Sequence, residues 1–344
     1  MGPTALLAGM MTVLLMSTSV PRKALAAEFY ERKTIRFVVG YAAGGGFDVY
    51  TRVIARHISK HIPGRPTTIV ENMAGAGSLI AANYIYNRAK PDGLTIGNWT
   101  GRLVLQQIME RKGIEFDSRK FEWIGAPETN YEACVLSGAS GVKNVEEWFA
   151  AKKPVRIGGT ALGATTVDVP RLLKLVLGLP IDVVQGYKGT ADVRLAVETG
   201  EVDGGCWTWD TMKRYWGGKI ATGEFHVVLQ ANERKHSDLP NVPLAIDYAK
   251  ARDDRQLIQV AIHDAAVILR PYSLPPGTPK EVVKVLRKAF MDTMKDPDFL
   301  AEASKADLGI DPLSAEKVEE AVSGFFKLKP EQVARLMKIL LPQK

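Results

Sequence analysis

The residues best suited to do chemistry in this chain form a glycine-rich turn, Gly40-Tyr-Ala-Ala-Gly-Gly-Gly-Phe-Asp48. It lies between a β-rich apolar run and an amphipathic helical stretch. Consecutive glycines let several backbone N–H groups converge on one point, and the N-terminus of the following helix carries a partial positive charge. The pattern therefore predicts an anion site, where Asp48 either caps the helix or holds water and ligand hydroxyl groups. The alternative is a strand-to-helix turn with Asp48 as its N-cap only.

A second loop, Glu71-Asn-Met-Ala-Gly-Ala-Gly-Ser78, repeats this chemistry after the next strand. Neither loop contains the G-x-G-x-x-G pattern of dinucleotide-binding proteins, so a nucleotide cofactor is not expected. The alternative role for Gly77 is to permit close packing of a helix on a strand. We expect no cofactor of any kind.

Catalytic and metal-binding patterns are weak. The histidines stand in no metal-binding motif and next to no cysteine, and Gly138-Ala-Ser-Gly-Val142 is not a nucleophile elbow. His57 and His61, four residues apart on one helix, could share a metal but fall at its far end. The sequence therefore favours binding over catalysis and predicts neither catalytic nor metal-ligating residues.

Short β-rich runs alternate with amphipathic stretches, which is typical of α/β proteins with mostly parallel sheets. Capping patterns fix several helices: Asn144 with Glu147, Gly200 after a helix end, and Thr278 before Pro279. The expected strands are 35–39, 68–71, 94–99, 133–136, 155–157, 181–184, 202–206, 225–229 and 266–270. The expected helices are 48–61, 78–88, 103–111, 145–151, 169–177, 191–199 and three that open near Pro279, Pro297 and Pro330.

The N-terminus reads as a secretory signal peptide spanning residues 1–26. An apolar run from Thr4 to Val20 precedes Ala24-Leu-Ala26, an A-x-A cleavage site, although Arg22 and Lys23 follow the run instead of preceding it. Removal would leave 318 residues, a natural length for two domains. The net charge of +7 would fall to +5, spread along the chain without a basic run, so no nucleic-acid partner is expected.

Two cysteines, Cys134 and Cys206, lie in apolar, strand-like segments. An oxidising compartment would permit a disulfide, but so few cysteines provide no disulfide framework. Two buried thiols are favoured over one bridge.

The ordered set of motifs resembles the Bug-type substrate-binding receptors of tripartite tricarboxylate transporters. It comprises Tyr41 to Asp48, Arg52, Val70 to Gly77, Ala89-Lys-Pro-Asp-Gly-Leu-Thr95, Gly186-Tyr-Lys-Gly189, Gly200-Glu-Val-Asp-Gly204, Asp238-Leu-Pro-Asn-Val-Pro243 and Leu274-Pro-Pro-Gly-Thr-Pro279. The resemblance spans the chain beyond the predicted signal peptide.

This resemblance implies a periplasmic α/β protein with the two-lobed type II binding-protein fold, each lobe a mostly parallel sheet flanked by helices, with the ligand cleft between the lobes. Lobe I would comprise 27–127 with 252–344, and lobe II 128–251. A ligand carboxylate would be held mainly by backbone N–H groups. Carried over, the ligand-binding residues are Ala43, Gly44, Gly45, Gly46, Phe47, Asp48, Asn72, Gly75, Ala76, Gly77, Gly159, Thr160, Ala161, Gly163, Ala164 and Thr165.

One departure from the family concerns the second-lobe loop. Family members usually have more serine there and a histidine at the start of the next helix, whereas this chain has Asp168 and Val169. An acid at the edge of the site would disfavour additional ligand carboxylates nearby.

Further candidates follow strands that should end at the cleft. Tyr187 and Trp207 are predicted to contact the ligand, Trp207 by stacking, with core packing as the alternative. Trp209 has the same two readings, and Lys188 is either a carboxylate partner or a solvated loop residue. Arg102 could clamp a carboxylate.

The sequence thus predicts a periplasmic, monomeric receptor that captures a small mono-, di- or tricarboxylate, possibly aromatic, and delivers it to the permease subunits of a tripartite transporter. The alternatives are a secreted α/β enzyme acting on a small carboxylate and a ligand sensor for a signalling system.

Overall fold

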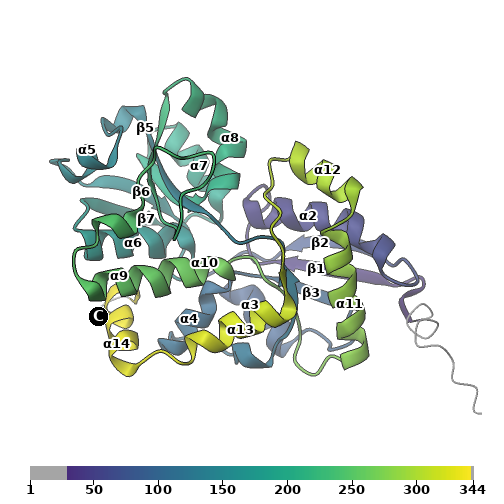
Figure 1. Ribbon diagram of the computed structural model, residues 1–344. Helices are drawn as coiled ribbons and strands as arrows, with labels where there is room; N and C mark the ends of the chain where they lie inside the picture. Colours follow the sequence, from purple (N-terminus) through teal and green to yellow (C-terminus); the bar gives the residue numbers. More distant parts are fainter. Residues whose placement is uncertain (1–28, 342–344) are drawn as a thin grey trace, which may run out of the picture.

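Two β-sheets, each flanked by helices, form the frame of the molecule (Figure 1). The computed structural model describes residues 29–341. The predicted signal peptide therefore lies outside the described residues. Within 29–341, no helix has the length and apolar character needed to cross a membrane.

The first sheet has six strands in the order β11-β4-β10-β3-β1-β2. Strand β1 pairs in parallel with β2 and β3, as the alternating sequence pattern predicts. Strand β10 is antiparallel to β3 and β4, and β11 is antiparallel to β4, so the sheet is mixed. Its strands are β1 (Thr34–Val39), β2 (Thr67–Asn72), β3 (Thr95–Asn98), β4 (Glu122–Ala126), β10 (Tyr272–Leu274) and β11 (Leu313–Ser314).

The second sheet has five strands in the order β7-β6-β8-β5-β9. Strand β6 is parallel to both β7 and β8, whereas β5 is antiparallel to β8 and β9. Its strands are β5 (Glu132–Ser137), β6 (Val155–Gly159), β7 (Ile181–Gln185), β8 (Gly204–Thr208) and β9 (Phe225–Gln230).

The helices bury one apolar face each against these sheets or against one another. Thus α2 is strongly amphipathic and buries Tyr50, Val53, Ile54 and Ile58. The helices are α2 (Gly46–Ile58), α3 (Leu79–Asn87), α4 (Arg102–Ile108), α5 (Val145–Phe149), α6 (Thr165–Leu177), α7 (Thr190–Glu198), α8 (Trp209–Ala221), α9 (Arg252–Ile258), α10 (Ala265–Val267), α11 (Lys280–Thr293), α12 (Pro297–Lys305), α13 (Ala315–Phe325) and α14 (Pro330–Leu340).

The C-terminal helix α14 crosses from the first sheet to the second. Figure 1 shows it beside α9, and it packs against α6. The Arg335 guanidinium forms an ion pair with Asp254, and Arg171 Nη1 donates a hydrogen bond to the Leu340 carbonyl oxygen at 3.3 Å. The end of the chain therefore fastens the two halves of the molecule together.

Most sequence-predicted elements agree with the structure to within a few residues, including Asn144 as the N-cap of α5, whose side chain accepts from the Glu147 N–H, and Gly200 one residue past the C-cap of α7. The strand predicted at 266–270 is wrong. Residues 265–267 are helical, and the strand follows at Tyr272–Leu274. An apolar run of five residues is compatible with a strand or a helix, and here it completes the helical segment that begins with α9. Helix α11 begins at Lys280, with Pro279 as its N-cap instead of Thr278.

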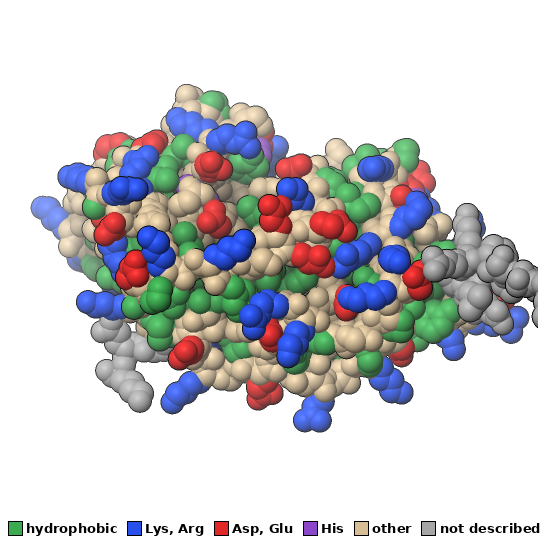
Figure 2. Space-filling model, turned by 60° about the horizontal axis from the view of Figure 1, so that its bottom comes forward, with side chains coloured by type: hydrophobic (Ala, Val, Ile, Leu, Met, Phe, Trp, Pro, Cys, Tyr) green, Lys and Arg blue, Asp and Glu red, His purple; other side chains and the backbone are tan. Residues whose placement is uncertain are grey.

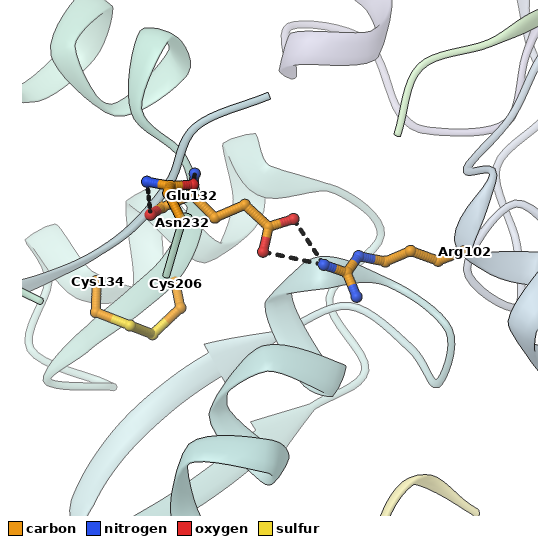
Figure 3. The surroundings of a disulfide bond; sticks show 5 residues. All are labelled: Arg102, Glu132, Cys134, Cys206 and Asn232. Carbon is orange, nitrogen blue, oxygen red and sulfur yellow. Dashed lines mark hydrogen bonds and ion pairs between the residues drawn. A yellow bond between two sulfur atoms is a disulfide. The ribbon is translucent and has the colours of Figure 1, made fainter. Parts of the chain in front are cut away.

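The expectation of two free thiols is also wrong. Cys134 and Cys206 form a disulfide that joins the antiparallel neighbours β5 and β8 (Figure 3). The two residues face each other directly in the strand register, with Cα atoms 4.1 Å apart. The sequence could not reveal this pairing, because the cysteines face each other only when β5 and β8 become neighbours, and the whole sheet decides that strand order.

Candidate functional site

A small, partly open cavity of about 40 Å³ lies between the two halves of the molecule. The turn after β1 forms one wall, and loops at the ends of β6 and β8 form the opposite wall. The lining residues are Tyr41, Gly45, Gly46, Phe47, Thr160, Ala164, Thr165, Thr166, Thr190, Trp207, Thr208, Thr211, Leu269 and Arg270. This volume admits water but leaves little free space, so in this arrangement the two walls lie close together.

The first wall is the N-terminus of α2. Gly45 is its N-cap, and no side chain caps the first turn. The N–H groups of the first turn have no partner within the helix and carry the positive end of the helix dipole. Gly45 and Gly46 line the cavity and have no side chain to separate their backbone from it. The anion site expected at this turn stays a prediction.

Three more helices begin at the same cavity, which the sequence analysis anticipated only in part. Ala164, Gly189 and Thr208 are the N-caps of α6, α7 and α8, and none of the three helices has a side-chain cap. The first turns of these helices line the cavity through Thr165 and Thr166 of α6, Thr190 of α7 and Thr211 of α8. Four helix N-termini therefore converge on one small space, an arrangement that favours a negative charge there.

Asp48 and Asn72 do not line the cavity but shape its first wall. The Asp48 carboxylate accepts hydrogen bonds from the Gly44 N–H (2.9 Å), from Arg52 Nε (2.9 Å) and from Asn72 Nδ2 (2.9 Å). Burial raises the pKa of Asp48, but the hydrogen bonds from Arg52, Gly44 and Asn72 outweigh it, so the net pKa is lowered. Asp48 thus stays ionised and holds the glycine turn in shape; it is neither the N-cap nor a cavity residue.

The second glycine loop makes a contact between the two halves of the molecule instead of lining the cavity. A Cβ atom on Gly77 would lie 2.8 Å from the Leu162 carbonyl oxygen. Arg111 spans the same contact, donating hydrogen bonds to the carbonyl oxygens of Leu162 (2.6 Å) and Ala76 (3.3 Å). The remaining predicted residues outside the cavity lining are Ala43, Gly44, Gly75, Gly159, Ala161, Gly163 and Tyr187.

Arg102 is committed to an internal ion pair. Its Nη2 donates to both carboxylate oxygens of Glu132 at 2.7 and 3.0 Å, and both side chains are fully buried (Figure 3). Its Nε donates to Thr165 Oγ1 at 3.0 Å, which ties the pair to the first turn of α6. Burial raises the pKa of Glu132, and the Arg102 guanidinium opposes that shift. The suggested clamp of Arg102 on a ligand is therefore not formed, and its role is to position Thr165.

Asp168, which departs from the family pattern, is buried in the first turn of α6. Its carboxylate accepts hydrogen bonds from the Gly163 N–H at 3.0 Å and from Gln106 Nε2 at 3.3 Å. Burial raises its pKa, and the nearby Arg102 opposes the shift. Asp168 stabilises the loop before α6 by accepting the hydrogen bond from Gly163, and it does not line the cavity.

Sequence reasoning missed several cavity residues, of which Arg270 is the charged one; the others are Tyr41, Thr166, Thr190, Thr208, Thr211 and Leu269. The Arg270 side chain is 2% exposed and forms an ion pair with Glu128. Nη1 donates to Asn130 Oδ1 at 2.6 Å, and Nη2 donates to Thr208 Oγ1 at 2.6 Å. The one available signal was a lone arginine after the apolar run 265–269, because a charge in such a place needs a buried partner.

Of the aromatic candidates, Trp207 lines the cavity, whereas Tyr187 and Trp209 do not. Trp207 packs against Trp216 with ring centroids 5.1 Å apart. Tyr187 donates a hydrogen bond to Glu201 at 2.6 Å, and Lys188 is exposed. Trp209 Nε1 donates to Asp238 on the surface side of α8. Tyr41, which is buried against the turn, is a further lining residue that was not predicted.

The histidine pair on the first helix has carboxylate partners far from the cavity. His57 Nε2 lies 2.6 Å from Glu302, and His61 Nε2 lies 2.8 Å from Asp296. Among residues 29–341, no group of three or more His, Cys, Asp or Glu side chains is arranged to hold a metal ion. On the face shown in Figure 2, basic and acidic side chains are interspersed, without a continuous basic patch.

Comparisons with known proteins agree with this architecture. The family described as "Tripartite tricarboxylate transporter family receptor" matches residues 50–340. The UPF0065 protein in the gbd 5' region of Cupriavidus necator is 27% identical over 311 residues, which cover 86% of this chain and 85% of that protein.

Solved structures share the fold. The periplasmic binding protein BugD superposes with a TM-score of 0.71 at 22% identity, covering 90% of this chain and 97% of BugD. MatC from Rhodopseudomonas palustris, solved with bound malate, superposes with a TM-score of 0.69 at 18% identity, covering 90% and 99% of the two chains. A second R. palustris protein, solved with adipate, gives 0.70 at 19% identity, covering 90% and 98%. The two-lobed binding-protein fold is therefore established for this chain.

Proposed function

Because the chain belongs to the family of tripartite tricarboxylate transporter receptors, we propose that it captures a small organic carboxylate in the cavity and delivers it to the permease subunits of such a transporter. The observation that carries the proposal is the convergence of four uncapped helix N-termini on one cavity. The malate and adipate bound in the two similar structures support the choice of a carboxylate.

The proposed mechanism is capture by closure of two lobes. Strands of the first sheet come from 34–126 and 272–314, and those of the second from 132–230. This distribution supports lobes at 27–127 with 252–344 and at 128–251. A carboxylate docks on the first-turn N–H groups of α2, and the other lobe then brings up α6, α7 and α8. Closure replaces the water around the carboxylate with N–H donors.

No chemical step is part of this proposal, and the receptor acts outside the cytoplasm once residues 1–26 are removed. A backbone N–H group recognises a carboxylate without reacting with it, and among residues 29–341 Arg270 is the only charged side chain that lines the cavity. The receptor therefore releases its ligand unchanged.

A thermal-shift screen of the chain from Ala27 against small carboxylates and their amides tests the proposal. A ligand at 100 times its dissociation constant adds about 2.7 kcal/mol of stability, so a carboxylate should raise the unfolding midpoint while its amide does not. Gly45→Asp places a negative charge at the N-cap of α2 and should abolish the shift. The proposal fails if no carboxylate stabilises the protein, or if Gly45→Asp binds as well as the wild type.

A further inference from the structure

We propose that Thr190, the first residue of α7, is the side chain through which the second lobe binds the ligand. Its hydroxyl donates a hydrogen bond to a carboxylate that is held on the first turn of α2. The inference rests on the proposed function and adds a binding residue to the same site.

The Thr190 hydroxyl lies against the glycine turn of the opposite wall. A Cβ atom on Gly45 would lie 2.8 Å from Thr190 Oγ1 and 3.8 Å from the Thr190 backbone nitrogen. Both residues line the cavity. Because Gly45 is the N-cap of α2 and Gly189 is the N-cap of α7, the hydroxyl lies beside two helix N-termini. A carboxylate bound at the first turn of α2 is therefore within its reach.

This hydroxyl is also free to bind. Six threonines line the cavity, and five of them form hydrogen bonds with other residues. The pairs are Thr160 with Thr166, Thr165 with Glu132, and Thr208 with Thr211, at 3.0, 3.3 and 3.1 Å. The Thr190 hydroxyl has no hydrogen-bond partner among residues 29–341, and unlike the unpaired Trp207 Nε1 it keeps accessible surface. A ligand oxygen can therefore accept its proton.

Contacts of α7 with the glycine turn fix the position of this hydroxyl. A Cβ atom on Gly189 would lie 3.3 Å from the Cβ atom of Ala42, so the start of α7 packs against the turn. The guanidinium carbon of Arg194, on α7, lies 3.8 Å from the centre of the Tyr215 ring. Tyr215 Oη in turn donates to the Gly44 carbonyl oxygen at 2.9 Å. Since these contacts join the two proposed lobes, the closed arrangement brings the hydroxyl to the turn.

One carboxylate can then bridge both lobes. One of its oxygens accepts from the N–H groups of α2, and the other accepts from Thr190 Oγ1. A hydrogen bond to an ionised acceptor is stronger than one between neutral groups. Without a ligand the hydroxyl has only water to bind, so its loss should weaken binding and leave the stability of the free protein unchanged.

Titration calorimetry on the chain from Ala27 tests the proposal with acetate, malate and adipate, which are ionised at about pH 7. The variants are compared with the wild type using the probe that the wild type binds most tightly. Thr190→Val keeps the shape of the side chain but removes the donor, so this probe should bind roughly tenfold or more weakly. Thr190→Ser keeps the hydroxyl and should bind it within about threefold of the wild type. The unfolding midpoint of free Thr190→Val should equal that of the wild type.

A role in packing alone gives the opposite order of affinities. Thr190→Val would then bind as well as the wild type, and Thr190→Ser, which loses the methyl group, would bind more weakly. Wild-type affinity in Thr190→Val, or an equal loss in both variants, overturns the proposal. Should Thr190→Val fail to fold, Thr190→Ala takes its place in the comparison with Thr190→Ser.

Thr199→Val is the matched control on the same helix. Thr199 is the C-cap of α7, lies outside the cavity lining, and donates from its hydroxyl to the Leu195 carbonyl oxygen at 3.0 Å. The control should lower the unfolding midpoint and leave the affinity for the probe unchanged. An equal loss of affinity in Thr199→Val and Thr190→Val overturns the proposal. Failure of all three probes to bind also overturns it, while the proposed function falls only if the wider carboxylate screen gives no shift.

Discussion

Adding one methyl group at Gly46 should prevent the lobes from closing on a ligand. The Cβ atom of Gly46→Ala would lie 2.6 Å from Thr211 Oγ1 and 2.7 Å from Arg270 Nη2, well inside van der Waals contact. Neither neighbour can give way easily. Thr208 Oγ1 donates to Thr211 Oγ1 at 3.1 Å, and Arg270 is fixed by its own partners. The backbone N–H of residue 46 is kept, so the substitution changes space and not the donors.

The size of the effect follows from the cost of overpacking, about 1–3 kcal/mol for an added methyl or methylene in a filled site. If closure bears this cost, the ligand affinity falls roughly 5- to 150-fold. In the proposed mechanism, opening moves α8 away from α2 and relieves the contact with Thr211. The contact with Arg270 remains, so we expect the free energy of unfolding without ligand to fall by only about 1 kcal/mol.

The assay is titration calorimetry with a carboxylate found in the screen, alongside denaturant unfolding of the free protein. Gly218→Ala is the matched control, because Gly218 lies within α8 and an added Cβ meets no atom within 4 Å. It should leave affinity unchanged and stabilise the protein by about 0.5–1 kcal/mol. Wild-type affinity in Gly46→Ala would refute the closed arrangement of α2 and α8 on which the binding mechanism depends.

Three further predictions concern stability. Replacing Cys134 and Cys206 by alanine, which opens a loop of 72 residues in sequence separation, should lower the free energy of unfolding by about 2–5 kcal/mol, and a reductant should weaken the wild type but not this variant in urea unfolding. Asp48→Asn should cost about 1–3 kcal/mol at pH 7. The pKa of Asp48 is lowered in the folded protein, so its contribution to stability is present above the unfolded pKa of about 4 and is lost as the pH falls. The free energies of unfolding of the wild type and the variant should therefore converge in acid. A difference that does not change with pH would contradict this. Burial lowers the pKa of His263 to about 4, so folding favours the neutral ring and wild-type stability should drop between about pH 6.5 and 4. His263→Leu should show a smaller drop, and equal slopes for the two proteins would exclude His263 as the cause.

Much of the site could be predicted from residue type and spacing. The glycines after β1 need no tertiary context to indicate converging N–H groups before a helix, and Gly45, Gly46 and Phe47 do line the cavity. Four residues predicted in the opposite wall, Thr160, Ala164, Thr165 and Trp207, line it as well. Thr160, Ala164 and Thr165 were implied by the family resemblance, whereas Trp207 was expected from its place near the end of a strand, since parallel strands end at a common edge.

The rest required distances that only the folded chain defines. Asp48 and Arg102 have residue types suited to ligands, yet their neighbours in space use up their hydrogen-bonding capacity. Arg270 stands far in sequence from the two glycine-rich loops, and it becomes a cavity residue only because the segment after α10 returns to the first turn of α2. No sequence pattern predicts that Arg270 lies beside the first turn of α2.

The sequence by itself determined the alternation of strands and helices and the glycine turn before α2, because these depend on local backbone freedom and periodicity. Tertiary structure alone decided the Cys134–Cys206 bridge, the antiparallel strands that make both sheets mixed, and the pairing of each buried charge. The physical reason is that strand order, disulfide pairing and ion pairing are properties of separations in space. Residues more than a hundred positions apart, such as Glu128 and Arg270, acquire their roles from each other only when the chain has folded.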